Sequence, residues 1–128
     1  MVTPSRRTPA GLRAALAAGL GPGAVWDGAG ANPYPGMLAL AEAAVVTADS
    51  VNMASEAASA GLPVLVAGVS GLSAKLARFQ ADFAAAGRAR PFAGRLETWP
   101  VAPLDEAGRV AAVLAREYLG EGSGRRVP

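Results

Sequence analysis

The sequence predicts an α/β fold in which helices flank a parallel sheet. The first observation is in residues 43–68, where two short apolar runs, 43–47 and 63–67, enclose a helical stretch. Such a β-α-β unit is nearly always right-handed, with parallel strands. The second observation is that 52% of the 128 residues are hydrophobic, many of them alanine, which suits helices packed closely on one core. We therefore expect a Rossmann-like single lobe over residues 1–119, followed by a flexible tail at 120–128.

The helix between the two runs is expected to begin at Asp49 or Ser50 and to end near Ala60. Either polar side chain can accept a hydrogen bond from a free first-turn N–H. Gly61 follows at the position where a left-handed residue closes a helix. Helical spacing divides the residues into two faces. The apolar face comprises Val51, Ala54, Ala57 and Ala58, and the polar face comprises Asp49, Asn52, Glu56 and Ser59.

The polar face permits two interpretations. In open parallel sheets, ligands bind beyond the carboxyl ends of the strands, where this helix begins. Its N-terminus, at Ser50, Val51 and Asn52, would offer free N–H groups to an anion. Glu56, nearly two turns farther on, could accept hydrogen bonds from the hydroxyls of a sugar. The alternative is that this face is an ordinary solvated helix surface.

Residues 2–5 resemble the end of a strand whose apolar beginning is missing, so we expect an upstream lobe of comparable size. A helix should follow, with Thr8 as its N-cap and Pro9 in its first turn, and end near Leu20.

Two arginines occupy the predicted junction between this strand and its helix. Arg6 and Arg7 follow Ser5, at the carboxyl end of the strand, and would face the same crevice as Ser50. Arginine pairs with phosphate through two parallel hydrogen bonds, so these three residues are candidates for binding an anion. Simple solvation of the two arginines is the alternative.

Residues 24–26 read as the next short strand, residues 27–33 as a glycine-rich loop, and residues 34–41 as a short helix. The loop lacks the third glycine of a dinucleotide-binding fingerprint. Asp27 and Asn32 stand near a strand end and could contact a base or an acceptor. A structured loop without a ligand is an equally good interpretation.

The carboxyl-terminal third carries two further predicted helices. The first starts after Ser73 and stops at Gly87, with an apolar stripe that includes Phe79 and Phe83. Residues 88–94 are expected to be an irregular connection and residues 96–100 extended at best. The last helix should span residues 104–119. The side chains available for burial on it are Val110, Val113, Leu114 and Leu119.

Composition excludes several classes of function. Cysteine and histidine are both absent, which removes disulfides, zinc sites of those ligands, imidazole bases and serine–histidine triads.

The net charge of +2 is small, so we expect no nucleic-acid partner. We expect no cofactor and no metal, and the absence of an Asp-x-Asp motif agrees with a metal-independent mechanism. No apolar run reaches about 18 residues and residues 1–10 lack an apolar core, so we expect a cytoplasmic protein without a membrane span or signal peptide. Peripheral membrane contact stays open.

Several motifs, in order along the chain, resemble the carboxyl-terminal half of the mitochondrial-fission "elongated mitochondria" family. They are Ser5-Arg-Arg-Thr-Pro9, Val25-Trp-Asp-Gly28, Asn32-Pro-Tyr34, Gly36-Met-Leu-Ala-Leu-Ala41, Val45-Val-Thr-Ala-Asp-Ser-Val-Asn-Met53, Arg78-Phe79, Gly87-Arg-Ala-Arg-Pro-Phe92 and Pro103-Leu-Asp-Glu106. The family has plant members, whose founding protein helps to recruit a dynamin-related GTPase to mitochondria. It also has many bacterial members, and we expect a bacterial source.

That family in turn resembles the GT-B glycosyltransferases, which consist of two Rossmann-like lobes. Residues 47–56 are similar to the nucleotide-sugar motif of the peptidoglycan N-acetylglucosaminyltransferase. The resemblance implies that Ser50 and Val51 face a diphosphate and that Glu56 binds ribose hydroxyls. It also implies metal-independent transfer, in which Arg6, Arg7 and the helix N-terminus stabilise the departing diphosphate. No residue is assigned as catalytic.

Two hypotheses of different classes follow. The first is a glycosyltransferase-like protein that binds a nucleotide-diphosphate sugar, favoured by the paired arginines and Glu56. The second is a non-catalytic interaction scaffold on the same fold. Asp49 favours the scaffold, because it stands where the enzyme motif is glycine-rich and its charge would repel a diphosphate.

Overall fold

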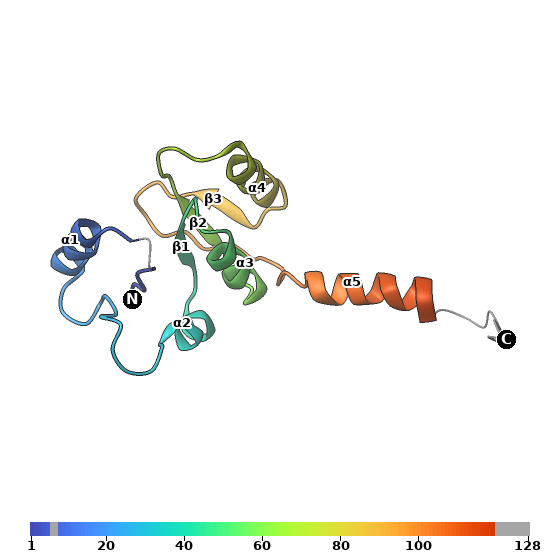
Figure 1. Ribbon diagram of the computed structural model, residues 1–128, viewed down its shortest axis with the longest axis horizontal. Coiled ribbons are helices and arrows are strands. Elements are labelled where there is room, and N and C mark those ends of the chain that lie inside the picture. Colours follow the sequence, from blue (N-terminus) through green and yellow to red (C-terminus); the bar gives the residue numbers. More distant parts are fainter. Residues whose placement is uncertain (6–7, 120–128) are drawn as a thin grey trace. The chain divides into compact units, whose positions relative to one another are not determined.

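The computed structural model describes residues 1–5 and 8–119 (Figure 1). The chain forms two compact units, one of residues 1–42 and one from residue 43 onward. The predictions made for Arg6 and Arg7 and for the tail at 120–128 lie outside the described residues.

The first unit contains α1 (Ala10–Leu20) and α2 (Tyr34–Leu40). Its two predicted strands are reduced to a single parallel bridge between Val2 and Val25. The N–H of Val2 donates to the carbonyl of Ala24 at 2.6 Å, and that of Trp26 donates to the carbonyl of Val2 at 2.9 Å. The next donor on this side would be residue 4, and Pro4 has no N–H. The predicted parallel direction is therefore correct, but proline limits the ladder to one bridge.

The start of α1 differs from the prediction. Thr8 does not cap the helix, because its Oγ1 accepts a hydrogen bond from the N–H of Ser5 at 2.9 Å and is held in a tight turn. Pro9 is the N-cap residue, with extended backbone angles, and the helix begins at Ala10. The predicted end at Leu20 is confirmed, and Gly21 follows it with φ +87°.

The second unit is built on an open sheet of three parallel strands in the order β1-β2-β3 (Figure 1). The strands are β1 (Ala44–Thr47), β2 (Val64–Ala67) and β3 (Ala89–Pro91). Ala44 is paired with Val64, and Val64 with Ala89. The predicted α/β class, with a parallel sheet flanked by helices, is confirmed.

The strand β3 was not predicted, because residues 88–94 were expected to be irregular. Its sequence, Ala-Arg-Pro, has no apolar run, and proline is rare within sheets. The structure shows why Pro91 is tolerated. Arg88 accepts from Val64 at 3.1 Å and Phe92 donates to Val66 at 2.9 Å, so alternate residues bond to β2. Pro91 is not one of these alternate residues, so the position where its N–H is missing faces away from β2.

The helix α3 (Val51–Ser59) connects β1 to β2. Its end is a Schellman motif, in which two backbone N–H groups beyond the helix satisfy its last carbonyls. Gly61 donates to Ala58 at 3.0 Å, and Leu62 donates to Ala57 at 3.0 Å. Gly61 has φ +77°, so the predicted left-handed glycine is confirmed. A tight, fully bonded turn therefore delivers the chain to β2.

The helix α4 (Ala74–Ala85) connects β2 to β3 and ends in the same way. Ser73 caps its start, as predicted, by accepting from the N–H of Leu76 at 3.3 Å. At its end Gly87, with φ +72°, donates to Ala84 at 2.9 Å, and Arg88 donates to Phe83 at 3.2 Å. Both helix-to-strand connections of the sheet thus use one local device.

The core lies where α3 and α4 meet the sheet. The apolar face of α3 is buried as predicted, with Ala54, Ala57 and Ala58 at most 1% exposed and Val51 half-buried. Alanines allow the helix to approach the strands closely. Val64 and Leu65 are the largest fully buried side chains, and because they are consecutive they point to opposite faces of β2. Both faces of the central strand are therefore covered.

The last helix is shorter than predicted and is not buried. It comprises α5 (Glu106–Leu114) and a π-helical turn, η1 (Ala115–Leu119). Asp105 sets its start, because Oδ1 accepts from the N–H of Gly108 at 2.7 Å. The prediction of burial is wrong for Val110 and Leu114, which are 47% and 49% exposed, and Val113 is half-buried. The side chain of Leu119 lies outside the described residues. Helical periodicity identified an amphipathic face but not a partner for it.

Candidate functional site

The candidate site is the turn between β1 and α3, at the carboxyl end of β1. Two backbone hydrogen bonds shape it: Ala48 donates to Ala67 at 2.9 Å, and Ser50 donates to Thr47 at 2.9 Å. Ser50 is the N-cap residue, as predicted, but its side chain makes no capping hydrogen bond to the helix. The Ser50 hydroxyl therefore does not occupy the first-turn N–H groups of α3, to which an anion would bind.

The predicted polar face of α3 is present. Asn52, Glu56 and Ser59 are exposed, while Asp49 and Ser50 are half-buried. Within residues 1–5 and 8–119, Glu56 forms no ion pair. A carboxylate in this position can accept hydrogen bonds from a ligand, and it is equally compatible with a solvated surface.

Gln80, on α4, reaches this turn and was not singled out from the sequence. Its Nε2 donates to the carbonyl of Ala48 at 2.8 Å, across 32 residues of chain. A signal was available: Gln80 lies on the same helical stripe as Leu76 and Phe83, so it is a polar residue in an apolar face. A polar side chain in that position needs a buried partner, and Ala48 supplies it.

The polar loop residues of the first unit order their own loop. Asp27 Oδ1 accepts from the N–H of Ala29 at 2.8 Å, and Asn32 Oδ1 accepts from the N–H of Tyr34 at 3.0 Å. Both are turns in which a side chain bonds the backbone two residues on. These contacts support the interpretation as a structured loop, although each oxygen can accept a second hydrogen bond.

Ser5 and Arg13 also act within the first unit. Ser5 closes the turn to Thr8, whose N–H donates to its carbonyl at 3.1 Å. Arg13 Nη2 donates to the carbonyl of Trp26 at 3.2 Å and to that of Asp27, which holds the start of the loop against α1. Convergence of Ser5, Asp27 and Asn32 with the turn at Ser50 stays a prediction, because these residues belong to two different units.

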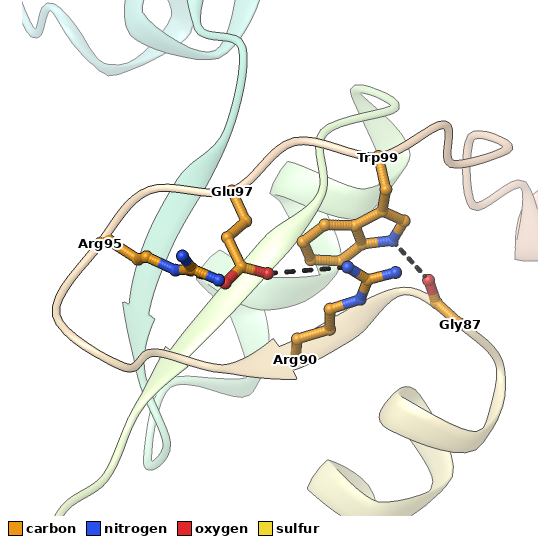
Figure 2. A network of polar contacts seen from close by, with 5 residues as sticks. All are labelled: Gly87, Arg90, Arg95, Glu97 and Trp99. Atoms are coloured by element: carbon orange, nitrogen blue, oxygen red, sulfur yellow. Dashed lines mark hydrogen bonds and ion pairs between the residues drawn. The ribbon is translucent and has the colours of Figure 1, made fainter.

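A second polar cluster lies on β3, between Arg90 and the segment that follows the strand (Figure 2). The Arg90 guanidinium stacks on the Trp99 ring, 4.2 Å from its centroid, and lies 3.7 Å from Glu97 Oε2. Arg95 Nε donates to Glu97 Oε1 at 3.0 Å, and Trp99 Nε1 donates to the carbonyl of Gly87 at 2.9 Å. Leu65 and Arg90 are register partners, so this segment covers the face of the sheet on which Leu65 is buried.

The chemistry of this cluster is structural. Arg90 and Arg95 are 52% and 79% exposed, and exposed ion pairs contribute about 0–1 kcal/mol each. The cation–π contact adds roughly 0.5–1 kcal/mol. Together these contacts hold residues 95–99 on the sheet.

Neither a metal site nor a membrane span is found in the part of the chain that the structure describes. No three side chains of the ligating types gather there. None of the described helices is long and apolar enough to cross a membrane.

Comparison with known proteins now decides the family. Residues 1–118 match the family model described as "Mitochondrial fission ELM1". The mitochondrial fission protein ELM1 of Arabidopsis thaliana is 38% identical over 127 residues, in a match that covers 94% of this chain. The chain belongs to the mitochondrial fission ELM1 family.

The chain spans 30% of the length of this plant ELM1 relative. No solved structure matches the chain significantly. The relative is a plant protein, which argues against the expectation of a bacterial source.

The structure assigns local roles to the motifs that resemble the ELM1 family. Residues 45–53 form most of β1, the turn and the start of α3, and residues 87–92 form the connection after α4 and the strand β3. Pro103 lies against the left-handed Gly61, and Leu104 donates to the carbonyl of Ala58 at 2.9 Å. The family motifs therefore include the connection that leads into β3 and a contact that closes the end of α3.

Proposed function

We propose that this chain is a nucleotide-binding portion of a mitochondrial fission ELM1 family protein, and that it binds a nucleotide-diphosphate sugar as one lobe of a GT-B-like arrangement. The observation that carries the proposal is the β1–α3–β2 unit. Its helix begins just beyond the carboxyl end of a parallel strand, which is where ligands bind in such sheets.

The geometry of α3 suits a diphosphate and its ribose. An anion at the helix N-terminus gains about 0.3–1 kcal/mol from the helix dipole. Glu56 follows Ser50 by six residues, or about 9 Å at 1.5 Å per residue. A ribose lying along the exposed face would therefore come within reach of the Glu56 carboxylate. In this proposal Arg6 and Arg7 neutralise the diphosphate, a second lobe closes the site, and no metal is required.

A second candidate function is a non-catalytic interaction scaffold. Asp49 favours it, because its carboxylate lies next to the start of α3 and would repel a diphosphate. The hydrogen bonds of Asp27 and Asn32 also favour it, since they account for these residues without a ligand. The scaffold predicts no nucleotide binding.

The two functions are separated by a binding experiment on Glu56→Gln. The variant keeps the shape and one acceptor but loses the charge. We expect the affinity for uridine or guanosine diphosphate to fall by about 1–2 kcal/mol, which is about 5- to 30-fold. Isothermal titration calorimetry measures it directly. Glu42→Gln is the matched control, because Glu42 is also exposed but lies in the first unit.

If the unaltered protein binds no nucleotide, the proposed nucleotide site is contradicted. Identical affinities of Glu56→Gln and the unaltered protein would contradict it as well. The arginines are tested in the same titration. Arg6→Ala and Arg7→Ala should each weaken binding by roughly ten- to a hundredfold, since a charge-assisted hydrogen bond contributes about 1.5–3 kcal/mol. Unchanged affinity would remove both from the site.

A further inference from the structure

We propose that Gln80 is a positioning residue for the turn between β1 and α3, and that it thereby orients the first-turn N–H groups of α3. The role in ligand binding rests on the proposed function. The role in the turn itself does not, because it concerns the ligand-free protein.

The contact satisfies a buried backbone carbonyl of the turn. Ala48 is 3% exposed, and its N–H already donates to Ala67 at 2.9 Å. Its carbonyl points to α4, where Gln80 Nε2 donates to it at 2.8 Å. Buried carbonyls without a hydrogen bond are costly, so the turn is stable in this orientation only while Gln80 is present.

The orientation of the Gln80 amide is determined by its surroundings. If the amide were rotated by half a turn, Oε1 would face the carbonyl oxygen of Ala48 and the two acceptors would repel each other. Gln80 Oε1 is buried, without a hydrogen-bond partner among the described residues. The hydrogen bond from Nε2 to Ala48 therefore forms although Oε1 is left unpaired, which is unfavourable in free energy.

The next backbone groups after Ala48 are those of the proposed site. Ser50 donates to Thr47 and accepts from Ala54, so the turn leads directly into the first turn of α3. A change in the direction of the Ala48 peptide would reorient the N–H groups that are to meet a diphosphate. Gln80 therefore acts on the ligand through the backbone and need not touch it.

The decisive variant is Gln80→Glu. At neutral pH its carboxylate faces the Ala48 carbonyl with no proton to donate, whereas a protonated carboxyl group can donate again. In ligand-free Gln80→Glu we expect hydrogen–deuterium exchange at residues 48–52 to be faster than in the unaltered protein. As the pH falls through the pKa of the introduced carboxyl group, the exchange rate of the variant should approach that of the unaltered protein at the same pH. Gln80→Met, similar in size but without a donor, should exchange faster at every pH.

Binding provides the second readout. We expect the affinity for uridine or guanosine diphosphate to fall about two- to tenfold in both variants, the loss of one ordinary hydrogen bond. The affinity of Gln80→Glu relative to the unaltered protein should recover at low pH, which a general loss of stability would not produce. Arg78→Met is the control, because Arg78 lies on the same helix with its side chain 86% exposed.

The outcomes distinguish the two proposals. Unchanged exchange at residues 48–52 in both variants would overturn the inference. If exchange at residues 48–52 is faster in both variants but their affinity for the nucleoside diphosphate is unaltered, Gln80 does not position a ligand. Faster exchange in a protein that binds no nucleotide would contradict the proposed function and leave the role of Gln80 in the turn supported.

Discussion

Replacement of Gly61 by alanine tests the account of how α3 is joined to β2. Gly61 has φ +77°, a left-handed conformation that costs a residue with a Cβ roughly 1–2 kcal/mol. A Cβ at this position would lie 3.4 Å from Pro103 Cγ, an ordinary van der Waals distance, so no clash adds to that cost. The ratio of folded to unfolded protein should therefore fall about 5- to 30-fold.

Urea unfolding, followed by circular dichroism, measures this loss in the free energy of unfolding. Gly61→Asn should lose clearly less, because asparagine tolerates the left-handed conformation. Gly68→Ala is the control: Gly68 has no positive φ and no atom within 4 Å of the added Cβ, so the change should stay within about 0.5 kcal/mol. Equal losses for Gly61→Ala and Gly61→Asn would refute the argument from backbone conformation. A larger loss that Pro103→Ala relieves would assign the cost to the contact instead.

Three further outcomes are expected. Leu65→Ala should lower the free energy of unfolding in urea by about 2–5 kcal/mol, since Leu65 is 1% exposed. A loss below about 1 kcal/mol would mean that neighbouring side chains move in to fill the space that Leu65 leaves. Asp105→Ala should remove the cap of α5, about 0.5–2 kcal/mol, seen as lower helicity in circular dichroism; unchanged helicity would contradict it. The hydrogen bond from Arg109 lowers the pKa of Glu106 in the folded protein. This pair therefore stabilises the fold at pH values above 4.5, the ordinary pKa of the carboxyl group, and the contribution is lost as the pH falls through the lower pKa of the folded state. A nuclear magnetic resonance titration should show a higher pKa for Glu106 in Arg109→Met, and an unchanged pKa would exclude the pair as its cause.

Local signals in the sequence were sufficient for the β1–α3–β2 unit. Its apolar runs, its helix faces and Gly61 each depend on residues a few positions apart. Such signals were insufficient where the structure depends on distant partners. The strand β3 exists because β2 offers it a hydrogen-bonded edge, and Arg90 is held there by Trp99. The exposure of α5 could not be predicted either, because periodicity specifies a face and not what covers it.

The candidate site shows the same division. The exposed face with Asn52 and Glu56 followed from helical spacing alone. Gln80 was missed because its partner, the carbonyl of Ala48, is 32 residues away and is a backbone atom with no signature in the sequence. Asp27 and Asn32 were identified as polar residues near a strand end, but their hydrogen bonds to the loop depend on backbone angles that residue type does not specify.

The order of the strands has a consequence for how this sheet is made. The strands lie side by side in the order in which they occur in the chain, and Val64 follows Ala44 by 20 residues and precedes Ala89 by 25. The entropy lost in closing a loop rises slowly with its length, and loops of this size are short for a parallel sheet. As the chain leaves the ribosome, each new strand finds the edge of the preceding one already synthesised. No strand of this sheet has to wait for a later segment to be inserted beside it, so the sheet can grow by one edge during synthesis.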